Sequence, residues 1–278
     1  MKPAPFTLLR PTSIDEALAL IQFHGEEAKV LAGGQSLVPL MNFRLARPRH
    51  LIDLNRIEGL DWVRLDGGAL ALGAMARQRD VERSPLVAER LPILRQALEH
   101  VAHPAIRNRG TVGGSLVHAD PAAELPLVSA LLDATFELRS AQASRSVAAQ
   151  DFYQGYLLTD IAANEILVEV KFQLPPASAG WCFDEVARRH GDFAIVAAAV
   201  LLGCDSQGNI NFARVALGGV GAAPLRLTEG ERALLGQRPE QELFRRVAGQ
   251  AAQRPAPPTG ISAPPAPRRP LAPGGPCP

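Results

Sequence analysis

Cysteine is scarce in this sequence. Only three cysteines occur among 278 residues, Cys182, Cys204 and Cys277, and no two of them form a C-x-x-C pair. A zinc site or an iron–sulfur cluster therefore cannot be assembled from this chain alone. Because disulfides are rare where thiols are kept reduced, this cysteine usage favours a reduced, cytoplasmic setting.

The sequence also lacks a large net charge and long apolar runs. Its formal charge is +1, which gives no overall reason to expect nucleic acid or an anionic membrane surface as a partner. The longest apolar run, residues 194–202, is far shorter than the roughly 20 residues that cross a bilayer. The first residues lead into no apolar signal segment. We expect a protein that is neither exported by a classical signal nor membrane-spanning.

Acidic residues are missing from the end of the chain. Residues 253–278 contain ten prolines, three arginines and no acidic residue. Such a composition forms neither a packed core nor an extended helix. We therefore expect residues 253–278 to be a disordered, proline-rich tail.

Two glycine pairs stand out in the rest of the chain, Gly33–Gly34 and Gly113–Gly114. Each is expected to form a turn, the first after an apolar strand at residues 29–31. Glycine adopts positive φ and lets a ligand approach the main chain, whose N–H groups then bind phosphate oxygens. Hydroxyl donors accompany both pairs, namely Ser36, Thr111 and Ser115. Two such turns facing one cleft would bind a pyrophosphate, although a single glycine pair is more often an ordinary bend.

Neither glycine pair belongs to a common nucleotide-binding signature. There is no lysine at the position that a P-loop requires, and neither segment matches G-x-G-x-x-G. P-loop and Rossmann sites are therefore excluded by the sequence.

Periodicity and capping residues predict a mixture of helices and strands. Ser13 and Glu16 have the spacing of a capping box, and a helix over residues 14–24 should end at Gly25. Residues 62–65 and 69–73 should form a hairpin around an Asp-Gly-Gly turn. Further helices are expected at residues 38–44, 122–132, 228–236 and 239–252 and in a segment ending before Pro104; further strands are expected at residues 50–54, 135–139, 165–174, 181–188, 194–204 and 210–218.

The sequence around both glycine pairs resembles a known family. The first pair lies in AGGQSL at residues 32–37, followed by RLARP at 44–48 and LIDLN at 51–55. The second lies in PAIRNRGTVGGS at residues 104–115, followed by ADPAAELP at 119–126. These segments resemble the two flavin-binding motifs of the FAD-carrying medium subunits of molybdenum hydroxylases. Aerobic carbon monoxide dehydrogenases are the nearer relatives and xanthine dehydrogenases the more distant ones, and the resemblance covers about residues 1–250.

The resemblance implies an α+β fold of the vanillyl-alcohol-oxidase (PCMH) type. The FAD-binding domain would span residues 1–176, with subdomains of about 1–56 and 57–176. A small α+β domain with a three-stranded antiparallel sheet would follow at residues 177–252. Pro175 and Pro176 mark the expected boundary. Family members usually continue past residue 252 with charged, helical sequence, so the tail departs from the pattern, as a shifted reading frame would produce.

The resemblance also implies a set of cofactor contacts. By the family's pattern, two segments wrap FAD, Glu124 supplies a carboxylate and Leu167 lines the cofactor, the full set being Val30, Leu31, Ala32, Gly33, Gly34, Gln35, Ser36, Leu37, Thr111, Val112, Gly113, Gly114, Ser115, Glu124 and Leu167. Glu124 has a second explanation, because acidic residues favour the first turn of a helix. Asp184 stands where xanthine dehydrogenase relatives have a lysine contact, and Val101 where they have a phenylalanine.

No catalytic base, nucleophile or substrate pocket is visible in the sequence. In the family, substrate is oxidised at a molybdenum cofactor on a large subunit, electrons pass through [2Fe-2S] clusters on a small subunit, and FAD delivers them to an external acceptor. The resemblance thus implies an FAD-dependent oxidoreductase subunit, in a dimer of heterotrimers. Two alternatives stay open: an inactive or scaffold copy without FAD, and a stand-alone flavin oxidase.

Two other polar groups are weaker candidates. His100 and His103 could share a helical face, but no third metal ligand is nearby in the sequence. Residues 188–192, RRHGD, could be a solvated turn, although the family carries a similar segment that could face a partner or the flavin edge.

Overall fold

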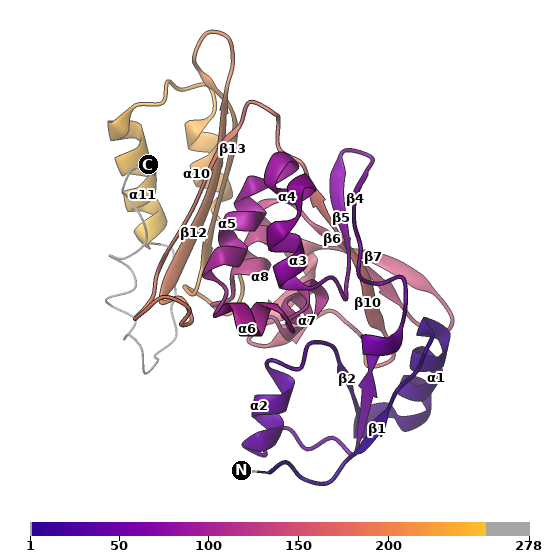
Figure 1. The fold of residues 1–278 in the computed structure, drawn as a ribbon. Helices are drawn as coiled ribbons and strands as arrows, with labels where there is room; N and C mark the ends of the chain where they lie inside the picture. Colours follow the sequence, from indigo (N-terminus) through magenta and orange to yellow (C-terminus); the bar gives the residue numbers. More distant parts are fainter. Residues whose placement is uncertain (1, 254–278) are drawn as a thin grey trace.

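The computed structural model describes residues 2–253. The predicted proline-rich tail lies outside the described residues apart from Gln253. Within the described range there are four sheets, and the three larger ones are joined by a central layer of short helices (Figure 1). None of the helices in residues 2–253 combines the length and the apolar character needed to cross a bilayer.

The first sheet is small and parallel. Its strand order is β1 (Thr7–Leu9), β3 (His50–Asp53) and β2 (Ala28–Leu31). Helix α1 (Ile14–His24) packs against it and confirms the predicted helix, since Ser13 Oγ accepts the N–H of Glu16 at 3.2 Å and Gly25 ends the helix at φ 51°. Strand β1 had no counterpart among the predicted strands.

Helix α2 (Leu37–Asn42) follows the first glycine pair and is shorter than predicted. Phe43 is the C-cap, and the helix cannot continue because Arg44 has φ 59°, outside the range of right-handed helices. Two single 3₁₀ turns, η1 (Gly25–Glu27) and η2 (Leu54–Arg56), complete this part of the chain.

The second sheet has five antiparallel strands. Their order is β4 (Val63–Asp66), β5 (Ala69–Gly73), β10 (Ile166–Gln173), β6 (Thr135–Arg139) and β7 (Ser144–Ala148). The predicted β4–β5 hairpin is confirmed, with Gly67 and Gly68 at φ 54° and 87°.

Six short helices lie between β5 and β6 in the chain, and α7 packs on β5 and β10. They are α3 (Gln78–Arg83), α4 (Pro85–Arg90), α5 (Pro92–His100), α6 (Pro104–Arg107), α7 (Val112–His118) and α8 (Glu124–Leu131). The predicted helix that ends before Pro104 is present as α5, and its Leu94, Ala97 and Leu98 are fully buried. Helix α6 was not predicted; it begins at a proline, a residue well suited to the first helical position. One prediction is wrong. The second glycine pair forms the first turn of α7 instead of a free turn.

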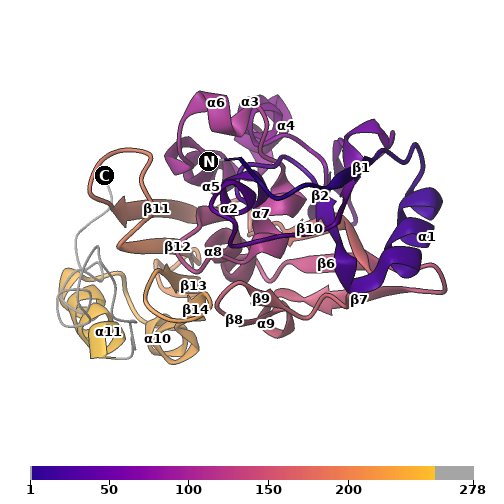
Figure 2. The ribbon, with the colours of Figure 1, turned by 90° about the horizontal axis from the view of Figure 1, so that it is seen from below.

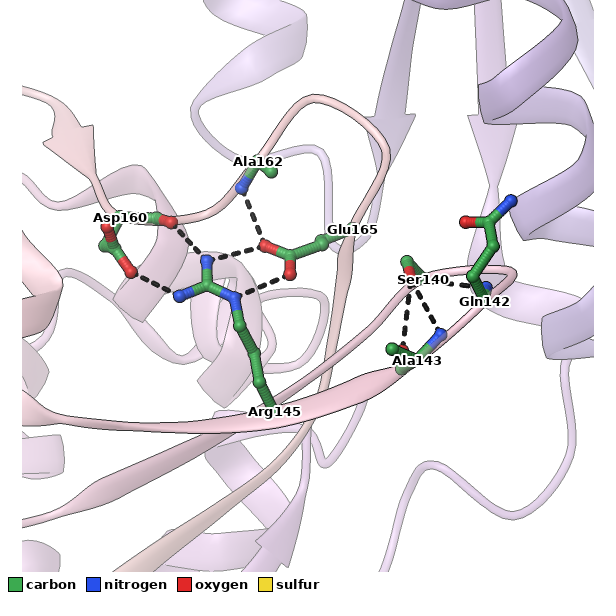
Figure 3. Close-up of polar contacts among 7 residues, drawn as sticks. All are labelled: Ser140, Gln142, Ala143, Arg145, Asp160, Ala162 and Glu165. Carbon is green, nitrogen blue, oxygen red and sulfur yellow. Dashed lines mark hydrogen bonds and ion pairs between the residues drawn. The ribbon is translucent and has the colours of Figure 1, made fainter.

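The far edge of the second sheet is fixed by one arginine (Figure 3). Arg145 on β7 pairs with Glu165 at 2.7 Å and with Asp160 at 2.5 Å. Glu165 also accepts the N–H of Ala162 at 2.8 Å. These contacts hold β7 against the loop that leads into β10. Helix α9 (Ala149–Phe152) and the pair β8 (Tyr153–Gly155) and β9 (Leu158–Thr159) lie between them in sequence.

The third sheet is antiparallel, in the order β11 (Gly180–Val186), β12 (Val196–Cys204), β13 (Ile210–Gly218) and β14 (Leu225–Arg226). The prediction of three strands is wrong, because β14 adds a fourth. Arg226 of β14 donates to Ala130 O at 2.7 Å and so links this sheet to α8. The two predicted helices are present as α10 (Thr228–Leu234) and α11 (Gln241–Gln253).

The largest core lies between the second and third sheets. It contains Phe136 and Val170 from the second sheet, Leu98 from α5, and Ala199 and Ala216 from the third sheet. Helices α5 and α8 contribute to this core and pack against the third sheet, α5 on β11 and α8 on β12 and β13 (Figure 2). The loop with Pro175 and Pro176 separates β10 from β11, but the core includes residues on both sides of it.

Candidate functional site

The first glycine segment, residues 31–37, connects the carboxyl end of β2 to α2. Gly34 has φ 74°, a conformation that favours glycine. A Cβ on Gly33 would overlap the carbonyl oxygen of Arg109 and lie 2.8 Å from Gly110 Cα. The main chain of the first segment therefore contacts the main chain that leads into the second segment, which confirms that the two segments lie together.

The backbone amides of the first segment are available to a ligand. Within residues 2–253, the N–H groups of Gly33, Gly34, Gln35 and Ser36 donate to no protein acceptor. The side chain of Gln35 folds back onto the same loop, where its Nε2 donates to Gly33 O at 2.9 Å. Four consecutive free donors at a half-buried turn form a site for an anion.

The amides of the second segment are already used. Val112 N–H donates to Ala76 O at 2.9 Å and Gly113 N–H to Ala74 O at 2.8 Å. Gly114 N–H donates to Thr111 Oγ1 at 3.0 Å, the N-cap of α7. The expectation that both segments offer free amides is therefore wrong, and of the four paired glycines only Gly34 has positive φ.

The second glycine pair serves close packing instead. A Cβ on Gly113 would lie 2.6 Å from Ala74 O, and one on Gly114 would lie 2.7 Å from Thr111 Oγ1 and 3.4 Å from Ala32 Cβ. Both glycines thus let α7 approach the end of β5 and the first segment. Among the predicted hydroxyls, Thr111 is buried and Ser36 and Ser115 are half-buried.

A cleft of about 470 Å³ opens at the first segment. Its lining includes the predicted residues from Leu31 to Gln35 and adds Arg109 from the loop before α7. The complete lining is Leu31, Ala32, Gly33, Gly34, Gln35, Val38, Pro39, Asn42, Asp53, Asn55 and Arg109. Val30, Ser36 and Leu37 adjoin this lining in the chain.

One arginine that the sequence did not single out connects the walls of the cleft. Arg77 donates to Arg109 O at 2.5 Å and to Asn55 Oδ1 at 2.6 Å. Asn55 Nδ2 in turn donates to Ala32 O at 2.9 Å. Long-range contacts of this kind leave no local pattern in the sequence.

Charges of both signs surround the cleft, with Arg109 and Asp53 in its lining and Arg77 beside it. Within the described residues, neither Arg77 nor Arg109 forms an ion pair with a carboxylate. Burial and the nearby Arg109 guanidinium lower the pKa of Arg77. Two neighbouring cations and four free amides are complementary to a pyrophosphate, so the residues present fit the anionic centre of FAD.

The two predicted contacts outside these segments lie elsewhere. Leu167 on β10 is only 4% exposed and belongs to the largest core, and it does not line the cleft. Glu124 is the first residue of α8 and is also buried. Val101 is half-buried at the end of α5.

Glu124 belongs to a buried polar cluster between α5, α8 and β11. His100 Nδ1 lies 3.2 Å from Glu185 Oε1, while Glu185 Oε2 is buried and has no partner within the described range. Burial, with the charges of Glu185 and Asp120, raises the pKa of Glu124 to about 8. The hydrogen bond to Glu185 raises the pKa of His100. At neutral pH, Glu124 is therefore mostly protonated.

This cluster predicts a stability that falls as pH rises. Unfolded Glu124 ionises near pH 4.5, but folded Glu124 keeps its proton to about pH 8, so the folded state binds more protons in between. His100 acts in the same direction above pH 6.5. We expect Glu124→Gln to match the native chain at pH 5 and to be more stable by a few kcal/mol at pH 8, since each tenfold change in proton affinity is worth about 1.4 kcal/mol.

Thermal melts of both chains across pH 5–8 would measure this difference. The exposed Glu242 on α11 provides a control, since Glu242→Gln should leave the pH profile unchanged. Equal slopes for the native chain and Glu124→Gln would contradict the assignment.

Residues 188–192 pack against the chain that follows α5. Gly191, at φ 83°, packs where a Cβ would lie 2.8 Å from Ala102 O and 2.9 Å from the His103 ring. The segment 188–192 thus rests on the end of α5. Within residues 2–253 no group of three or more His, Cys, Asp or Glu residues is arranged to hold a metal ion.

Comparison with known families identifies the fold. Residues 4–175 match the family model described as the FAD binding domain in molybdopterin dehydrogenase. The chain belongs to this family. Residues 181–274 match the C-terminal domain of the carbon monoxide dehydrogenase flavoprotein. The chain is thus an FAD-binding medium subunit of the molybdenum hydroxylase type, an oxidoreductase subunit, and the α+β fold is confirmed.

Individual relatives cover most of this medium subunit. It is 43% identical to the 6-hydroxypseudooxynicotine dehydrogenase complex subunit alpha of Paenarthrobacter nicotinovorans, over 84% of this chain and 79% of that protein. It is 41% identical to the caffeine dehydrogenase subunit beta of Pseudomonas sp. (strain CBB1), over 85% and 80%. A chain of carbon monoxide dehydrogenase from Hydrogenophaga pseudoflava superposes with a TM-score of 0.94 at 36% identity, covering 98% of this chain and 94% of that one.

Proposed function

We propose that this medium subunit takes electrons from iron–sulfur clusters on a small subunit and passes them through FAD to an external acceptor. The observation that carries the proposal is the row of four free amides beside two arginines without carboxylate partners, within a chain of this family. Bound FAD would supply the redox chemistry, while the protein positions it and sets its electrostatic environment.

We assign the pyrophosphate to the first segment. The amides of Gly33 to Ser36 would donate to its oxygens, and Arg109 would add a charged donor from the opposite wall. The second segment would support this wall through Thr111 and the glycine pair, and Ser36, Thr111 and Ser115 would add hydroxyl donors. Glu124 and Leu167 remain predicted contacts of the cofactor, without support from the lining of the cleft.

The partners are proposed from the relatives, which are named as subunits or chains of larger enzymes. A large molybdopterin-binding subunit and a small [2Fe-2S] subunit would join this chain in a dimer of heterotrimers. The relatives are named for different substrates, among them caffeine and carbon monoxide, so the substrate is expected to be selected on another chain. A cytoplasmic location and a domain boundary near residue 176 also remain proposals.

The proposal predicts that this chain binds FAD by itself but needs the other subunits for substrate to reduce the flavin. The chain purified alone should bind FAD and show flavin absorbance, but substrate should reduce that flavin only when the large and small subunits are added. A colourless chain that cannot be reconstituted with FAD would favour an inactive or scaffold copy. Substrate-dependent flavin reduction by the isolated chain would favour a stand-alone oxidase.

A further inference from the structure

Arg77 contacts two residues that line the cleft, Arg109 and Asn55. Its guanidinium donates to Arg109 O on one wall and to Asn55 Oδ1 on the other. Through Asn55 Nδ2 it reaches Ala32 O, directly before the glycine pair of the first segment. Its two terminal nitrogens each serve one acceptor, Nη1 the Arg109 carbonyl and Nη2 Asn55 Oδ1, in the fixed planar geometry of a guanidinium.

The main chain of Arg77 is fixed independently of its side chain. It pairs with Thr111 in an isolated antiparallel bridge, and its carbonyl accepts the N–H groups of Asp80 and Val81 at the start of α3. A change of side chain at position 77 therefore removes the contacts to Asn55 and Arg109 and leaves these main-chain bonds in place.

Burial and the neighbouring Arg109 make the positive charge of Arg77 unfavourable at this position. Burial of the guanidinium and the like charge of Arg109 lower the pKa of Arg77, while the more weakly acting Asp80, Asp61 and Asp53 raise it. An anion in the cleft would offset the repulsion between the two arginines.

We propose that Arg77 is a positioning residue for the pyrophosphate. It holds the free amides of residues 33–36 and the Arg109 wall at the spacing that the anion requires, acting through Asn55 on one side and through the Arg109 carbonyl on the other. This inference rests on the proposed FAD site and adds a residue that neither glycine segment contains.

The test compares Arg77→Met, Arg77→Lys and Asn55→Ala in FAD titrations of the full chain. We expect Arg77→Met to weaken FAD binding by about 10- to 100-fold, because the variant loses the charge-assisted hydrogen bonds to Asn55 and to the Arg109 carbonyl. Arg77→Lys should recover only a minor part of the loss, because a lysine ammonium cannot form the two-armed contact. The double variant with Arg77→Met and Asn55→Ala should lose less FAD affinity than the product of the two single fold-losses, since both substitutions break the same contact.

Two further measurements separate positioning from general damage. Inorganic pyrophosphate should raise the thermal midpoint of the native chain but not of Arg77→Met, whose midpoint without ligand should match the native value. Arg95→Met, on the exposed face of α5, is the matched control and should bind FAD normally.

Unchanged FAD binding in Arg77→Met would overturn the inference, as would full recovery in Arg77→Lys. Normal binding in Asn55→Ala beside a defect in Arg77→Met would show that Arg77 acts on the ligand directly, which also contradicts a positioning role. If the native chain itself binds no FAD, the proposed function fails instead.

Discussion

Replacing Gly33 by alanine is expected to weaken FAD binding by about 10- to 100-fold or more. The added Cβ would overlap the carbonyl oxygen of Arg109, a main-chain atom that cannot rotate away as a side chain could. Overpacking of this kind typically costs about 1–3 kcal/mol, and every 1.4 kcal/mol is tenfold in a binding constant. The strain falls between the two walls of the cleft, so it should separate the free amides from Arg109. Fluorescence titration with FAD measures the effect.

Gly155 on β8 offers the matched control, because a Cβ there would meet nothing within 4 Å. Gly155→Ala should bind FAD as the native chain does. Circular dichroism should show that Gly33→Ala keeps the three sheets. Stoichiometric, native-like FAD binding by Gly33→Ala would show that contact between the two segments does not shape the site.

The second large effect concerns the buried ion pair that supports the second segment. Arg107 on α6 and Glu82 on α3 are both buried, with Arg107 Nε 2.8 Å from Glu82 Oε2. Arg107 also donates to Val101 O at 2.7 Å. We expect Glu82→Ala to lower the free energy of unfolding by about 3–5 kcal/mol, because it leaves the buried Arg107 without its carboxylate.

Urea unfolding would measure this loss, and two further chains sharpen the result. Removing both charges, in a Glu82→Leu and Arg107→Met double variant, should restore much of the stability, since no uncompensated charge stays buried. Glu99→Ala, which breaks the exposed pair with Arg95, should change the free energy of unfolding by less than about 1 kcal/mol. A small effect of Glu82→Ala would mean that water reaches Arg107.

Local signals in the sequence were enough for much of the fold. The capping box at Ser13, the glycine stop at Gly25 and the Asp-Gly-Gly turn each specify a structure through neighbouring residues, and each prediction is confirmed. Strand β14 contains only Leu225 and Arg226, too few residues to show a period. It is defined by its pairing with Ala216 and Leu217, which a local pattern cannot reveal.

The cleft shows the same limit more clearly. Its glycine segments were recognisable from the sequence, but the different uses of their amides were not. A helix cap at Thr111 and main-chain acceptors at Ala74 and Ala76 take up the donors of the second segment. Arg77 and Asn55 were missed because their contacts join positions more than twenty residues apart. These contacts form where the segments after β2 and β3 meet the segments before α3 and α7.

The central claim is that the free amides of residues 33–36 bind the pyrophosphate of FAD, while the amides of residues 112–114 do not. Amide proton and nitrogen chemical shifts of the isotope-labelled chain, followed by NMR as FAD and then pyrophosphate are added, test this directly. Both ligands should produce their largest shifts at Gly33, Gly34, Gln35 and Ser36, with small shifts at Val112, Gly113 and Gly114, whose N–H groups keep their protein acceptors. Large shifts at residues 112–114 with unchanged resonances at residues 33–36 would contradict the account.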